Sequence, residues 1–327
     1  MTRGHKQRLS RGRLKRRPAA ELASAAQSLE RVPFEFGEEI PRRVVDLIRK
    51  RASGVGDKYV LAAILIIADC LRIKPMGPLA DPFFQSTRLP DGSVSYRFAE
   101  RITTVGETLF LLRGMDGFAE FCRRLRARSR EDVFYELMAA RHFHEGGFSL
   151  HVSPETGIKG QDFDFSATKG VEKVNVEVTH IGTDDYSAAT LRNALGKKRG
   201  QVPDNAPAVI WCAFPKEWRL QDPKIETNLV QSAQEFYRIT QRINVVVFMS
   251  EYHIEPAAPN ENGVVLYPFV PVMNNRARHP TKLLDFLFDG TIDIRRNIAD
   301  GASVVDAVEA LKRDSKFYRW VDQIAGE

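Results

Sequence analysis

Cysteine is scarce in this chain. Its 327 residues contain three, Cys70, Cys122 and Cys212, which lie far apart and each in an apolar stretch. Such spacing excludes a dense disulfide framework and offers no cysteine pair for a zinc site. We therefore expect three reduced, buried thiols, which is the usual state of cysteine in a cytoplasmic protein.

Long apolar runs are also missing. The longest, residues 59–71, contains Asp69 and is too short to span a bilayer. Residues 18–30 follow a basic segment but lack the apolar core of a secretory signal. The sequence thus predicts no association with a membrane and a cytoplasmic location.

Several catalytic motifs are absent. The chain has no GxSxG and no GxGxxG, and Gly196-Lys197-Lys198 lacks the earlier glycine and the following Ser or Thr of a P-loop. Four histidines lack the HExxH spacing of a zinc site: His142, His144, His151 and His180. We therefore interpret them as ordinary packed or surface residues and not as metal ligands. These absences argue against nucleotide-binding, serine-hydrolase and zinc-peptidase classes.

Acidic residues are missing from the first 17 positions, which hold eight Arg or Lys residues. The other 310 residues carry 40 basic and 42 acidic groups, a net of −2, so the overall charge of +6 belongs to this tail. A basic tail can bind phosphate backbones by counterion release, and the predicted contacts are Arg13, Lys15, Arg16 and Arg17. A solvated, disordered segment over residues 1–30 is the equally plain alternative.

Helical periods dominate residues 31–128, which we interpret as a helical accessory region. The predicted helices begin at Pro41 and then cover 59–71, 102–113 and 117–128, with a break rich in proline and glycine over 74–92. The region ends in an arginine run that could face nucleic acid, although a solvated helix face explains it as well: Arg123, Arg124, Arg126, Arg128 and Arg130.

Residues 129–275 predict a mixed β-sheet flanked by helices, an α/β (α+β) fold class. A capping box at Ser129 begins a helix that ends at Gly146-Gly147. The succeeding elements are strands at 148–152, 162–166 and 174–181, a helix at 188–199, and strands at 208–214 and 244–249 with a helix at 225–240 between them. A strand at 264–272 is expected at an edge because of Pro268, and helices at 281–288 and 302–313 occupy the C-terminal segment 276–327.

Carboxylates recur on these predicted strands. Glu177 shares a strand face with Asn175 and Thr179, and Asp162 shares a face with Asp164. If the two strands form a hairpin, one of the aspartates lies near Glu177. Adjacent carboxylates repel unless a cation lies between them, which favours a hard divalent metal such as Mg²⁺ or Mn²⁺.

A third carboxylate, Glu136, lies near the buried edge of the helix that begins at Ser129. An unpaired acid there would be costly, so Glu136 either joins the metal site or pairs with an arginine such as Arg141. On the helix 188–199, the stripe through Leu191 and Leu195 also turns Lys198 toward the sheet.

The order of helix glutamate, aspartate strand, glutamate strand, lysine helix and apolar strand resembles the core of the PD-(D/E)xK nuclease superfamily, over about residues 129–250. The resemblance implies a restriction-endonuclease-like fold with Glu136, Asp162 and Glu177 as metal ligands and Asp164 as the alternative to Asp162. Gln161 stands at the usual proline, and Thr179 stands at the usual lysine and cannot supply its charge. Lys198 is the expected replacement, with Gln201 as a supporting residue.

The implied function is a magnesium-dependent nuclease that hydrolyses phosphodiester bonds, with DNA favoured over RNA and with Glu136, Asp162, Glu177 and Lys198 as catalytic residues. Two alternatives stay open. An inactive member of the same fold would bind nucleic acid or protein without cutting, and Thr179 supports this interpretation. A purely structural protein would keep its carboxylates far apart.

Overall fold

The computed structural model describes residues 39–51, 55–84, 97–158, 161–254, 264–288 and 315–326. The tail residues Arg13, Lys15, Arg16 and Arg17 and the helix expected at 302–313 lie outside these ranges. Residues Phe34–Glu327 form one compact unit. In the part of the chain that the structure describes, no helix is both long and apolar enough to cross a membrane.

A six-stranded mixed sheet organises this unit, in the order β1-β2-β3-β4-β5-β8. The first three strands pair antiparallel, β3, β4 and β5 run parallel, and β8 pairs antiparallel with β5. The bounds are β1 Ser149–His151, β2 Phe165–Lys169, β3 Glu172–His180, β4 Ala208–Ala213, β5 Val245–Met249 and β8 Phe269–Met273. A separate two-stranded sheet joins β6 (Tyr252–Ile254) to β7 (Val264–Leu266).

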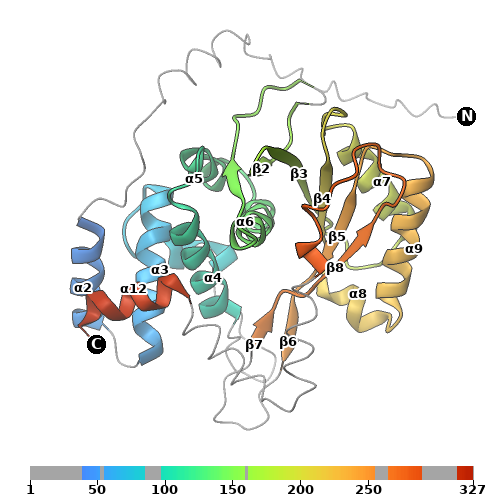
Figure 1. Ribbon diagram of the computed structural model, residues 1–327. Helices are drawn as coiled ribbons and strands as arrows, with labels where there is room; N and C mark the ends of the chain where they lie inside the picture. The colour runs from blue at the N-terminus through green and yellow to red at the C-terminus, as the bar shows by residue number, and fades with distance from the viewer. Residues whose placement is uncertain are drawn as a thin grey trace, which may run out of the picture. The chain divides into compact units, whose positions relative to one another are not determined.

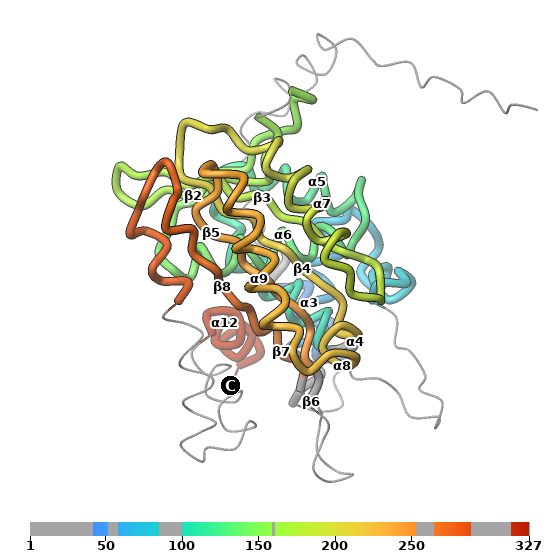
Figure 2. Tube along the Cα trace, turned by 90° about the vertical axis from the view of Figure 1, so that its right-hand side faces the viewer, coloured from blue at the N-terminus to red at the C-terminus, as the bar shows by residue number. Residues whose placement is uncertain are grey.

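Helices cover both faces of the large sheet, which confirms the predicted mixed sheet flanked by helices (Figure 1). On one face α6 (Arg130–Glu145) packs against β3, and it is backed by α2 (Glu39–Arg51), α3 (Val55–Leu71), α4 (Arg97–Leu112), α5 (Phe118–Ala127) and α12 (Lys316–Ala325). The other face carries α7 (Ala188–Arg199), α8 (Lys216–Gln221) and α9 (Ile225–Arg238), and this side is turned to the viewer in Figure 2. Two short 3₁₀ turns, η1 (Gly77–Ala80) and η2 (Pro82–Phe84), follow α3.

Side-chain alternation along the strands divides the apolar interior into two cores. Val174, Val176 and Val178 of β3 join the larger core with the helices of the N-terminal half. Ile210 and Cys212 of β4 point the opposite way, into a smaller core under α7 and α9. The helical region and the sheet therefore share one continuous core on the α6 side.

The end strand shows the effect of proline on a sheet. The segment expected as one strand at 264–272 forms two strands, β7 and β8, on either side of Pro268. Pro271 lies within β8, opposite Val247, and β8 is the last strand of the sheet. Proline has no N–H to donate to a further strand, so the edge position that the sequence predicts is confirmed.

Candidate functional site

The hairpin of β2 and β3 brings two carboxylates together. Phe165 pairs with Val176, so Asp164, the residue before β2, lies opposite Glu177. The Val178 N–H donates to Asp164 Oδ2 at 2.7 Å, which holds this carboxylate against β3. Asp164 and Glu177 are 6% and 1% exposed. Two acids from neighbouring strands thus meet in a buried position.

Lys198 reaches this pair from α7. Its ammonium donates a hydrogen bond to Glu177 Oε1, and its side chain keeps 20% of its exposure. Burial lowers the pKa of Lys198, but attraction by Glu177 and Asp164 outweighs it, and the net pKa lies above the ordinary value. Lys198 is therefore a positive charge at the carboxylate pair, on the solvent side of Glu177.

Glu136 approaches from α6 but is engaged by arginines of the preceding helix and its cap. Arg124 Nη1 lies 3.0 Å from Glu136 Oε2 and 3.3 Å from Asp164 Oδ1. Arg128 also donates to Glu136 and lies 3.8 Å from Asp164. Because Arg124 is only 1% exposed, its guanidinium is an internal cation that bridges two acids of the cluster.

Arg124 is the residue of this cluster that the sequence pattern does not single out, because it lies within a run of arginines. The helical spacing held a usable sign: Arg124 follows Phe121 by three positions and Glu120 by four, which places it on the buried stripe of α5. Arg124 Nε indeed lies 3.3 Å from Glu120 Oε1. The cluster then comprises Glu120, Arg124, Glu136, Asp164, Glu177 and Lys198.

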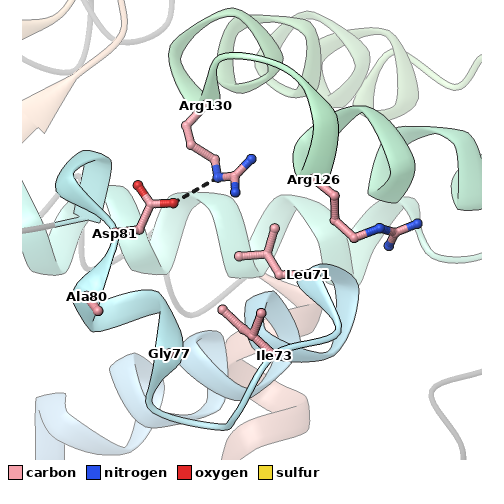
Figure 3. Close-up of a pocket in the computed structure, with 7 residues that line it drawn as sticks. All are labelled: Leu71, Ile73, Gly77, Ala80, Asp81, Arg126 and Arg130. Carbon is pink, nitrogen blue, oxygen red and sulfur yellow. Dashed lines mark hydrogen bonds and ion pairs between the residues drawn. The ribbon is translucent and has the colours of Figure 1, made fainter.

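The rest of the arginine run is also bound to the chain itself. Arg123 pairs with Glu120 at 2.5 Å, Arg126 donates to the Cys70 carbonyl at 2.5 Å, and Arg130 pairs with Asp81 at 2.9 Å. The last two arginines line a pocket of about 400 Å³ with Leu71, Ile73, Gly77, Ala80 and Asp81 (Figure 3). None of the clustered acids lines this pocket, so the pocket and the carboxylate site are separate features.

Asp162 does not lie opposite Glu177 in the strand pair. Its Oδ1 accepts the N–H and the hydroxyl of Thr156, at 2.6 and 2.7 Å, and so closes a loop. The physical reason is where the strand starts: β2 begins at Phe165, three residues later than expected, so Asp164 takes the place opposite Glu177. The structure therefore differs from the expectation for Asp162 and favours its alternative.

Three buried side-chain oxygens of β3 and of the end of α7 have no hydrogen-bond partner among the described residues: Asn175 Oδ1, Glu177 Oε2 and Gln201 Oε1. Asn175 is two residues before Glu177 on the same face of β3, and the Gln201 N–H donates to the Lys198 carbonyl at 2.9 Å. Thr179, partly exposed, follows Glu177 on that face and pairs with Cys212. Buried acceptors require a donor or a cation, so this face of β3 has unmet capacity for positive charge.

Burial raises the pKa of two glutamates, Glu136 and Glu177. It raises the pKa of Glu136 to about 8, with help from Asp164, because the two effects outweigh the attraction of Arg124 and Arg128. Burial followed by Asp164 also raises the pKa of Glu177 well above its ordinary value, against the opposing effect of Lys198. Positive charge brought near either carboxyl would oppose these two effects and favour its ionised form.

The donor set fits a hard divalent cation that keeps most of its water. Asp164 and Glu177 supply carboxylate oxygens from adjacent strands, and Glu177 Oε2 has no hydrogen-bond partner in the described part of the chain. Within the described ranges, no group of three or more His, Cys, Asp or Glu side chains could hold a metal ion. One or two carboxylates completed by water and substrate phosphate is the pattern that Mg²⁺ uses.

The raised pKa of Glu136 has a consequence for stability. The folded protein binds this proton up to about pH 8, whereas the unfolded chain releases it near the ordinary value of 4.5. Stability from this group is therefore present below the ordinary pKa and is lost as the pH rises through the folded pKa. Between pH 4.5 and about pH 8, we expect the free energy of unfolding to fall less in Glu136→Gln than in the wild type. Urea denaturation at a series of pH values would measure both. Parallel wild-type and variant curves would contradict a shifted Glu136.

Comparison with known proteins gives no match: no family model fits the sequence, and neither the curated proteins nor the solved structures contain a significant relative. The site must therefore be interpreted from its own chemistry.

Proposed function

We propose that this protein is a metal-dependent nuclease that hydrolyses phosphodiester bonds of nucleic acid, with DNA as the favoured substrate. The observation that carries the proposal is the meeting of Asp164, Glu177 and Lys198 at the start of β2, with one oxygen of Glu177 unpaired. The proposal agrees with the resemblance to the PD-(D/E)xK superfamily, with Asp164 in the place first given to Asp162. The three buried thiols suit a cytoplasmic setting.

Asp164 and Glu177 are the residues that would hold Mg²⁺ or Mn²⁺. Such an ion supplies Lewis acidity toward the phosphate and makes water a better nucleophile at neutral pH. Water adds to phosphorus, the bond to the leaving oxygen breaks, and that oxygen takes up a proton. Lys198, whose ammonium contacts Glu177, would stabilise the negative charge that grows on the phosphate, a role that Thr179 cannot perform. Arg124 holds Glu136 and Asp164 in position through an ion pair with each.

The two aspartates provide the first test. We expect Asp164→Asn to lower cleavage by roughly 10²- to 10³-fold, the usual cost of removing one charged group from such a site. Asp162→Asn, three residues from β2 and bonded to Thr156, serves as the matched control and should retain activity. Cleavage of labelled single- and double-stranded DNA and RNA would be measured with Mg²⁺, with Mn²⁺ and with EDTA. Activity that survives in Asp164→Asn but not in Asp162→Asn would reverse the assignment.

A second candidate is a module of the same architecture that binds nucleic acid without cutting it. The observation that favours it is the guanidinium of Arg124 between Glu136 and Asp164, which pairs with both acids without any metal. This function predicts nucleic-acid binding that is insensitive to EDTA and unchanged in Asp164→Asn, with no cleavage by any of the three proteins.

A further inference from the structure

Arginines gather where three loops meet at the amino-terminal ends of β4 and β5. The loops are 200–207, 239–244 and 274–281, and they follow α7, α9 and β8 respectively; they lie at the top of the sheet in Figure 1. We call the set Arg199, Arg242, Arg276 and Arg278 the arginine surface. It lies outside the carboxylate cluster.

Buried amides fasten these loops to one another. Asn244, 3% exposed, accepts the Ala208 N–H at 3.0 Å and donates to the His279 carbonyl at 2.7 Å. Asn274, 4% exposed, donates to the Ile243 carbonyl at 2.8 Å. The backbone N–H of Arg278 donates to the Gln241 carbonyl at 2.7 Å. The arginines are therefore presented by a hydrogen-bonded frame, which reduces the entropy lost when a ligand binds.

The arginine surface carries more positive charge than the acidic side chains around it can neutralise. Asp204 lies 3.4 Å from Arg242 and 3.5 Å from Arg278, and it is the one acid that pairs with the surface within the described residues. Arg199 spends one nitrogen on the Ile239 carbonyl at 3.3 Å, and Arg276 is exposed. Asp204 thus pairs with two of the four guanidinium groups, and solvent-accessible ion pairs of this kind are weak and easily exchanged.

We infer that the arginine surface binds the phosphate backbone of nucleic acid beside the carboxylate site. Guanidinium forks match phosphate oxygens in pairs, and several on one frame can follow a charged strand. The surface begins at Arg199, the residue that follows Lys198 at the end of α7, and Lys198 itself contacts Glu177. A membrane surface is a poorer fit, because it would require an apolar face, and among these loops Ile239 is the large apolar side chain that is exposed.

The link to the carboxylate site rests on the proposed nuclease function, whereas binding itself does not. Binding is therefore measured without catalysis, on the full-length chain in EDTA, by fluorescence anisotropy of a labelled DNA duplex over a range of salt concentrations. Each phosphate contact contributes about 0.9 to the slope of log K against log salt. The Arg276→Ala/Arg278→Ala double variant should therefore bind more weakly, with a slope shallower by about 2.

Asp204→Asn provides the opposite change, since it removes the one paired acid and keeps the shape of the side chain. It should bind the duplex more tightly than the wild type. The matched control is Arg49→Ala/Arg51→Ala, which removes two exposed arginines from α2. The basic tail is unchanged in all these proteins, so it cannot produce differences between them.

Three outcomes would overturn the inference. The first is an unchanged salt slope in the Arg276/Arg278 variant, and the second is an equal loss of duplex affinity in the Arg49/Arg51 variant. The third is an Arg276/Arg278 variant that no longer binds phosphatidylserine vesicles but binds the duplex as the wild type does. Duplex binding that depends on the arginine surface without any metal-dependent cleavage would support the surface and count against the nuclease. Metal-dependent cleavage that is unchanged in the Arg276/Arg278 variant would support the nuclease and count against the arginine surface.

Discussion

The Glu177→Gln variant is expected to lose metal-dependent cleavage by at least about 10²- to 10³-fold, because the amide keeps the shape of the side chain but loses its charge. Glu177 is 1% exposed and lies between Asp164 on the neighbouring strand and Lys198 on α7. The substitution removes both a candidate metal ligand and the anion that holds Lys198 in place. Initial rates on a labelled DNA substrate with Mg²⁺ or Mn²⁺ would measure the loss.

A control must separate this loss from general damage to the protein. Glu235→Gln changes a glutamate on α9 whose side chain is 33% exposed and pairs with the exposed Arg192. It should cleave like the wild type, and urea denaturation of both variants would show whether either is unfolded in the assay. Equal residual cleavage in wild type and Glu177→Gln would sink the nuclease proposal, and so would a loss of the same size in Glu235→Gln.

Arg124→Met is expected to destabilise the fold by about 3–5 kcal/mol, the usual cost of removing one partner from a buried ion pair. The substitution leaves Glu120, Glu136 and Asp164 without their shared internal cation. Since the pKa of Glu136 is already raised to about 8, its carboxyl can take up a proton in acid solution once Arg124 is gone. The destabilisation should therefore be larger at alkaline pH than at acidic pH.

The neighbouring arginine is the natural control. Arg123 pairs with the same Glu120, but its side chain is 43% exposed, so Arg123→Met should cost at most about 1 kcal/mol. Adding Glu136→Gln to Arg124→Met should recover part of the lost stability, because it removes a buried acid that is left with Arg128 as its cation. Urea denaturation gives all of these values. Equal costs for Arg123→Met and Arg124→Met would contradict an internal role for Arg124.

Local pattern was sufficient for much of the architecture. Alternation along residues 174–180 correctly placed Val174, Val176 and Val178 in one core and Glu177 on the opposite face. Helical spacing correctly turned Lys198 inward, and continuous apolar runs correctly marked β4 and β5 as strands covered on both faces. These properties repeat every two residues in a strand or about every 3.6 in a helix, so they can be recognised without knowing any long-range contact.

The choice between Asp162 and Asp164 needed the folded chain. Both aspartates share a strand face by alternation, and only the register of β2 against β3 decides which one lies opposite Glu177. In that register the side chain of Asp164 accepts the Val178 N–H, and Thr156 donates to Asp162 in the loop before the strand. Such hydrogen bonds join positions whose spacing in sequence carries no periodic pattern.

By itself, then, the sequence determined the order of the strands from β1 to β5, the two-sided burial of the central strands and the faces of Glu177 and Lys198. Only the tertiary structure decided that Asp164 completes the carboxylate pair, that Arg124 leaves the arginine run to bridge two buried acids, and that Arg199, Arg242, Arg276 and Arg278 share one surface. Periodicity is a property of each element alone, whereas buried charge is balanced by groups that arrive from different elements.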